Sequence, residues 1–71
     1  MRQIGTVPDE DNAQRFEDYA LTLGIKTRIE QDNGQWAVWV YEEDQLAQGR
    51  QELELFQQNP QDPRYVEAAR P

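Results

Sequence analysis

Acidic side chains are the groups in this chain that stand closest together and could do chemistry. Asp9 and Asp11 form one pair, and Glu42 and Glu43 form another. Paired carboxylates can divide the roles of general acid and general base when their surroundings separate their pKa values. Both pairs, however, stand at the start of a stretch with helical periodicity, where acidic residues cap a helix and complement its dipole. We therefore interpret them as helix-start residues.

The other ingredients of catalysis are missing from the sequence. It contains no Ser, His or Cys. Its three threonines are Thr6, Thr22 and Thr27, and the sequence indicates no general base that would activate their hydroxyl groups. Residues 9–12 superficially resemble a calcium loop but lack its glycine and its distal bidentate glutamate. No glycine-rich phosphate loop is present. We therefore expect no enzymatic activity, no metal and no cofactor in this chain.

Charge and length narrow the classes of partner further. The net charge of −7 opposes binding to the phosphates of nucleic acid or to an anionic membrane surface. The longest apolar run, residues 36–41, is six residues long, whereas a membrane-spanning helix needs about 20. We expect a soluble chain, no nucleic-acid partner and no direct membrane insertion. At 71 residues it has room for one small domain of marginal stability.

The elements that hold these residues follow from hydrophobic periodicity. Residues 3–7 are expected to form a short strand that Pro8 ends, with Asp9 as the N-cap of a helix over residues 10–23. Gly24 stands at the position that favours a helix C-terminus. Residues 25–30 alternate apolar and polar types, which is typical of a half-buried strand.

The second half of the chain also contains turn, strand and helix signals. Asn33-Gly34 predicts a tight hairpin, because these residues tolerate the positive φ angles of a type I′ turn. Residues 36–41 form the returning and most apolar strand, and a second helix is predicted over residues 44–58. Gly49 lies in the apolar stripe of that helix, at a cost of about 1 kcal/mol in helix propensity. We expect it to allow close packing on the sheet.

These elements predict an α+β fold, a β-α-β-β-α two-layer sandwich with both helices on one face. A right-handed crossover makes the first two strands parallel. The most apolar strand should be central and antiparallel to both of the others, which gives a three-stranded antiparallel/mixed sheet in the order 1-3-2. This arrangement is similar to a ferredoxin-like fold without its last strand, and it leaves one sheet face open to water or to a partner.

The facing of residues 36–41 determines what the open face presents. We place Trp36, Val38 and Val40 toward the helices, while an inverted register would put Trp39 in the core instead. In the first case the long basic side chains could shield Trp39 by cation–π contact, or Trp39 could anchor a docking surface. The candidate interaction surface comprises Lys26, Arg28, Trp39 and Tyr41.

A proline-containing exit segment, residues 59–71, follows the compact part, residues 1–58. Pro60 and Pro63 disfavour a regular helix, so we expect an extended backbone. We predict that Tyr65 folds back against the second helix or the sheet edge and that Arg64 reaches a surface carboxylate. The alternative is a disordered tail. The residues singled out in this segment are Pro60, Asp62, Pro63, Arg64 and Tyr65.

Five short patterns together are similar to one known module. They occupy residues 16–19, 24–25, 38–40, 52–56 and 59–65, and the last, Asn-Pro-x-Asp-Pro-Arg-Tyr, is the most specific. The chain resembles the N-terminal cytoplasmic domain of bacterial rhomboid intramembrane serine proteases of the GlpG type. In that family a membrane bundle carries the serine nucleophile and the histidine base, and neither has a counterpart in this sequence.

The resemblance implies a non-catalytic accessory domain with an interaction or regulatory role. Its location would be the cytoplasmic face of the bacterial inner membrane. Its implied partner is the membrane-embedded protease domain of the same chain, with self-association or another protein partner as further options. The alternative hypothesis is a stand-alone interaction or small-ligand regulatory domain that uses the open sheet face or a strand edge.

Overall fold

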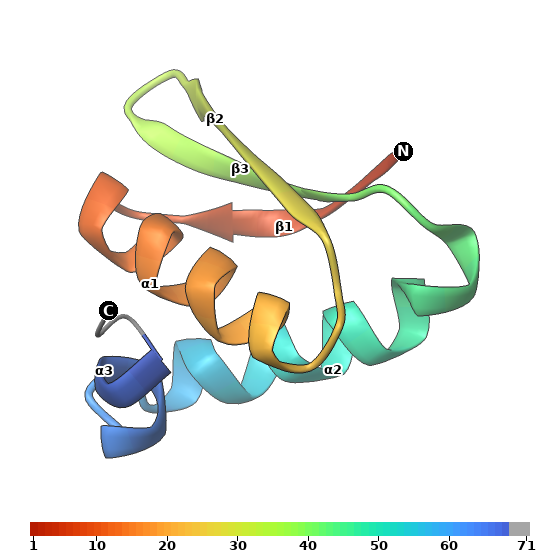
Figure 1. Cartoon of the computed structure of the whole chain (residues 1–71). Helices are drawn as coiled ribbons and strands as arrows, with labels where there is room; N and C mark the ends of the chain where they lie inside the picture. Colours follow the sequence, from red (N-terminus) through yellow and green to blue (C-terminus); the bar gives the residue numbers. More distant parts are fainter. Residues whose placement is uncertain (69–71) are drawn as a thin grey trace.

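A computed structural model describes residues 1–68 of the chain (Figure 1). Three strands, three α-helices and one short 3-10 helix are defined in this range. In chain order they are β1 (Arg2–Val7), α1 (Glu10–Thr22), β2 (Thr27–Asp32), β3 (Gln35–Val40), η1 (Glu43–Gln45), α2 (Leu46–Gln58) and α3 (Pro63–Ala68).

The sheet has the order β1-β3-β2, and β3 runs antiparallel to both of its neighbours. Helices α1 and α2 lie on one face of the sheet, and no helix of residues 1–68 covers the opposite face (Figure 1). The predicted α+β class and the predicted strand order are therefore confirmed. The more detailed likeness to a ferredoxin-like fold stays a prediction.

Local sequence signals account for the boundaries of α1 and of the hairpin. The Asp9 carboxylate accepts a hydrogen bond from the Asn12 backbone N–H at 2.8 Å, which confirms its role as N-cap. Asn33 and Gly34 both have positive φ, 51° and 83°, as a type I′ turn requires. This turn pairs Asp32 with Gln35 and so sets the register between β2 and β3.

The facing of β3 agrees with the predicted register and contradicts the inverted one. Val38 and Val40 are completely buried in the core, and Trp36 packs against it from the same side. Trp39 alternates with them and lies on the open face, because successive side chains of a strand point to opposite sides of a sheet. The two β-branched valines thus provide the floor on which both helices pack.

Two glycines allow α2 to approach the sheet closely. A Cβ atom at Gly49 would lie 3.0 Å from Val40 Cγ2, so the expected packing role of this glycine is confirmed. A Cβ atom at Gly5 would lie 2.8 Å from Leu53 Cδ2, closer than real Cβ atoms come. Space for Leu53 between α2 and the sheet is therefore made by a missing side chain on β1.

Replacing Leu53 should separate the buried face of α2 from its exposed face. Leu53 is 3% exposed and Leu55 is 41% exposed. We predict that Leu53→Ala lowers the free energy of unfolding by roughly 2–5 kcal/mol, because it leaves a cavity, whereas Leu55→Ala changes it by about 0.5 kcal/mol or less. Urea denaturation of the two variants measures this difference. Equal losses would mean that α2 packs with another face inward.

Candidate interaction surfaces

The exit segment contains a helix rather than the extended backbone expected from its prolines. Helix α3 begins at Pro63, in the first turn, where the missing N–H of proline has no helical partner to lose. The Asp62 carboxylate accepts a hydrogen bond from the Arg64 backbone N–H at 3.0 Å and caps this turn. The prediction of an extended segment was wrong because a proline that breaks a helix interior also suits a helix start.

Tyr65 attaches α3 to the rest of the molecule. Its side chain is 2% exposed and belongs to the same core as the valines of β3. Its ring makes edge-to-face contacts with Phe56 of α2, at 4.7 Å between ring centroids, and with Tyr19 of α1, at 4.8 Å. The predicted contact with the second helix is confirmed, and the contact with α1 adds a second attachment. This burial contradicts the alternative of a disordered tail up to Tyr65.

Polar contacts around Tyr65 complete the attachment. The Arg15 guanidinium donates to the Pro60 carbonyl at 3.4 Å, which links α1 to the start of the exit segment. Helix α3 then lies against α1 (Figure 1). Arg64 pairs with Asp62 at 3.2 Å, so the predicted contact of Arg64 with a carboxylate is confirmed, although the partner is its own helix cap.

Three pKa shifts report the environment of this segment. Hydrogen bonds from Arg64, first of all from its backbone N–H, hold the pKa of the Asp62 carboxyl below its usual value. The same carboxylate raises the pKa of the Arg64 guanidinium. Burial raises the pKa of the Tyr65 hydroxyl above its ordinary value of 10.0. Both charged groups are exposed and their pair contributes little, so burial of the Tyr65 ring dominates the docking.

The four residues of the candidate interaction surface lie on β2 and β3 or directly beside these strands, and Lys26 also lines the groove between α1 and β2. Arg28 stands directly opposite Trp39 across β2 and β3, and the Lys26 carbonyl accepts from the Tyr41 N–H at 3.4 Å. Arg28 pairs with Glu30 at 2.9 Å, and no cation–π contact with Trp39 is found within residues 1–68. Whether these four residues bind a partner stays a prediction.

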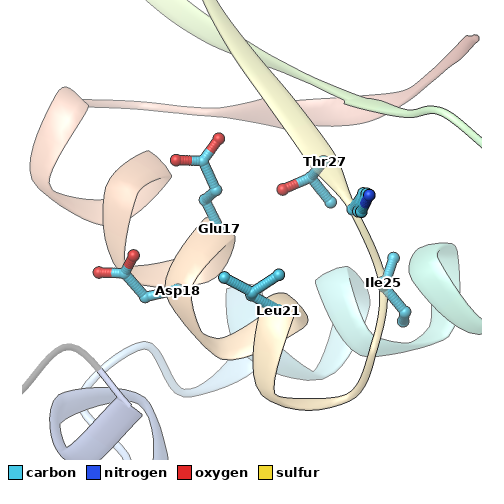
Figure 2. A pocket seen from close by; sticks show the side chains of 6 residues that line it. Glu17, Asp18, Leu21, Ile25 and Thr27 are labelled. Atoms are coloured by element: carbon cyan, nitrogen blue, oxygen red, sulfur yellow. The ribbon is translucent and has the colours of Figure 1, made fainter.

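A groove between α1 and β2 was not predicted from the sequence. Figure 2 shows side chains from α1 on one side of it and side chains from the β2 segment on the other. Its volume is about 270 Å³, and its lining residues are Glu17, Asp18, Leu21, Ile25, Lys26 and Thr27. The sequence signal that could have indicated this groove is Leu21, an apolar residue that lies beside the apolar stripe of α1. In the structure Leu21 is 61% exposed.

One carboxylate of each pair considered for catalysis has a structural partner. Asp9 caps α1, and Glu43 pairs with Arg2 at 3.1 Å. Within residues 1–68 no three acidic side chains gather closely enough to share a metal ion. In the same range no helix combines the length and the apolar character that crossing a membrane demands.

Fold and surfaces together define a small α+β domain whose helix α3 is docked on its two main helices. The family model described as the cytoplasmic N-terminal domain of rhomboid serine protease matches residues 1–70. The chain therefore belongs to this family of cytoplasmic domains, as its sequence resemblance indicated. The family description makes the protease domain the implied partner, and the domain itself is the non-catalytic part of such a protease.

Removing the Tyr65 ring should destabilise the whole domain. We predict that Tyr65→Ala lowers the free energy of unfolding by roughly 3–5 kcal/mol, the range for deletion of a buried ring. Its exposed neighbour Val66 provides the control, and Val66→Ala should change stability by about 0.5 kcal/mol or less. Thermal unfolding followed by circular dichroism measures both. An unchanged melting temperature for Tyr65→Ala would contradict the docking of α3.

The raised pKa of Tyr65 also predicts a loss of stability in alkali. A hydroxyl whose pKa is higher in the folded state favours folding of its neutral form, so its contribution is complete below pH 10.0 and falls as pH rises through the folded-state value. We expect Tyr65→Phe to reduce this alkaline loss, measured by urea denaturation between pH 8 and about pH 11. The same change at the exposed Tyr41 is the control and should leave the pH dependence intact.

Proposed function

We propose that this domain regulates a rhomboid serine protease by fixing the direction in which the chain leaves toward its membrane-embedded protease domain. Residues 1–58 form the folded body in this proposal, and residues 59–71 form the connection. The observation that carries the proposal is the burial of Tyr65 between α1 and α2. A freely jointed tether would have no need of a buried aromatic side chain.

Several contacts of the connecting segment support a fixed exit. Asp62 caps α3, Arg15 holds the Pro60 carbonyl, and Tyr65 occupies the core. Each contact holds a different residue of the segment, so rotation about a single backbone bond cannot release the whole segment. A domain held in one orientation can present the same face to its partner in every molecule, whereas a flexible tether distributes that face over many orientations.

The family match favours this role over that of a stand-alone interaction domain, because the family is defined by its association with a protease. The role also explains why the sequence contains neither the serine nor the histidine that serine protease chemistry requires. In this proposal the membrane-embedded part carries out catalysis, and the domain fixes the direction in which the chain leaves toward it.

The test compares Tyr65→Ala with Tyr65→Phe in the full-length protease. The phenylalanine variant retains the ring contacts with Phe56 and Tyr19, whereas the alanine variant removes both. We expect Tyr65→Ala to alter the rate of cleavage of a fluorogenic single-helix substrate in proteoliposomes. Tyr65→Phe and the exposed control Val66→Ala should retain the original rate.

Backbone relaxation of the same variants separates docking from activity when the amides of β3 in Tyr65→Ala keep order parameters of about 0.85, which shows that the domain remains folded. Amide order parameters from Asn59 to Val66 should be near 0.85 in the unmodified domain and should fall below about 0.6 in Tyr65→Ala. Released order parameters together with an unchanged cleavage rate would refute the regulatory role. Low order parameters in the unmodified domain would refute the fixed exit itself.

A further inference from the structure

We propose that the free edge of β2 and the groove between α1 and β2 bind an extended basic peptide by strand addition. This inference goes beyond the orientation role, because it uses residues other than those that dock the exit segment. Edge strands expose unpaired backbone groups that can pair with another chain, and strand addition beside a helix is a known mode of peptide recognition.

Strand β2 has a row of backbone groups directed away from the sheet. Among residues 1–68 it pairs with β3 alone, and the Lys26 carbonyl accepts from the Tyr41 N–H across that pair. Alternate residues of an antiparallel strand direct their backbone groups to opposite sides. Arg28 and Glu30 therefore bond toward β3, and the outward groups belong to Thr27, Ile29 and Gln31.

The opposite edge of the sheet is protected, which singles out β2. In β1 the pairing register shifts between Gln3 and Gly5, as at a β-bulge. The Gln57 side chain of α2 donates to the Thr6 carbonyl at 2.7 Å. Bulges and occupied carbonyls are devices that discourage pairing at an edge, and β2 shows neither within the described chain.

The groove lies where the side chains of an added strand would fall. Thr27 and Ile29 point toward the helix layer, so every second side chain of a strand paired with β2 would point there as well. These side chains would meet Leu21, which is largely exposed, and Ile25, which is fully buried (Figure 2). An apolar residue of modest size fits a groove of about 270 Å³.

The charge of the groove specifies the rest of the peptide. Glu17 and Asp18 stand on its α1 side, and both accept hydrogen bonds from the Gln14 amide, at 3.0 and 3.2 Å. Neither carboxylate takes part in an ion pair within residues 1–68, and Lys26 is the basic residue of the lining. Two acids against one base, in a chain of net charge −7, favour a partner with Lys or Arg beside its apolar residues.

The probe is a blocked ten-residue peptide of alternating lysine and valine, titrated into the ¹⁵N-labelled domain. We expect chemical-shift changes in Thr27–Asp32 and in α1 around Leu21, with little change in β1. A matched peptide with N-methylated valines lacks backbone donors and should bind at least about tenfold more weakly, because strand addition depends on those hydrogen bonds.

Two charge-matched variants test the location of the site. Leu21→Lys places a cation in the groove, and Leu55→Lys places the same charge on exposed α2, so both should remain folded. We expect at least about tenfold weaker binding for Leu21→Lys and a change within about twofold for Leu55→Lys. Equal weakening in the two variants would show a general charge effect and overturn the proposal.

Three further results would also overturn it. No shift change at millimolar peptide would mean that β2 does not accept a strand of this chemistry. Equal affinity for the N-methylated peptide would exclude strand addition. Shift changes at β2 that depend on protein concentration without peptide would identify a second copy of the chain as the occupant of this edge.

Discussion

The insertion of the Tyr65 ring between Phe56 and Tyr19 is the contact on which the rest of this structure depends. The domain is too short to build a deep core, so a residue after its last long helix fills the space between α1 and α2. Phe16 adds a further aromatic contact, with its ring centroid 5.5 Å from that of Phe56. The valines of β3 lie in the same core. Packing of the core and attachment of α3 therefore depend on the same side chain.

Local rules predicted most of the fold because each rested on a feature of adjacent residues. The positive φ angles of Asn33 and Gly34 and the cap at Asp9 require no knowledge of distant contacts. Helix α3 was missed because Pro63 has two opposite meanings, and the choice depends on whether Tyr65 finds a place in the core. The groove beside Leu21 was missed because it exists only once α1 and β2 have been placed side by side.

The acidic composition also has a structural meaning that a search for catalytic pairs would overlook. Asp9 and Asp62 cap helices, and Glu43 pairs with Arg2. Glu17 and Asp18 differ from these carboxylates, because their hydrogen bonds to the neutral Gln14 leave their charge uncompensated within residues 1–68. A functional interpretation of so acidic a chain thus begins with the carboxylates that have no cationic partner in the fold.

The position of Tyr65 in the chain has a consequence for synthesis. Chains emerge from the ribosome with the N-terminus first, and domains generally fold as units while they emerge. Here strands, turn and both long helices are made before the ring that closes their core. The core is complete only when Tyr65 has been synthesised, so a nascent chain that ends before this residue lacks one of the rings that fill the space between α1 and α2.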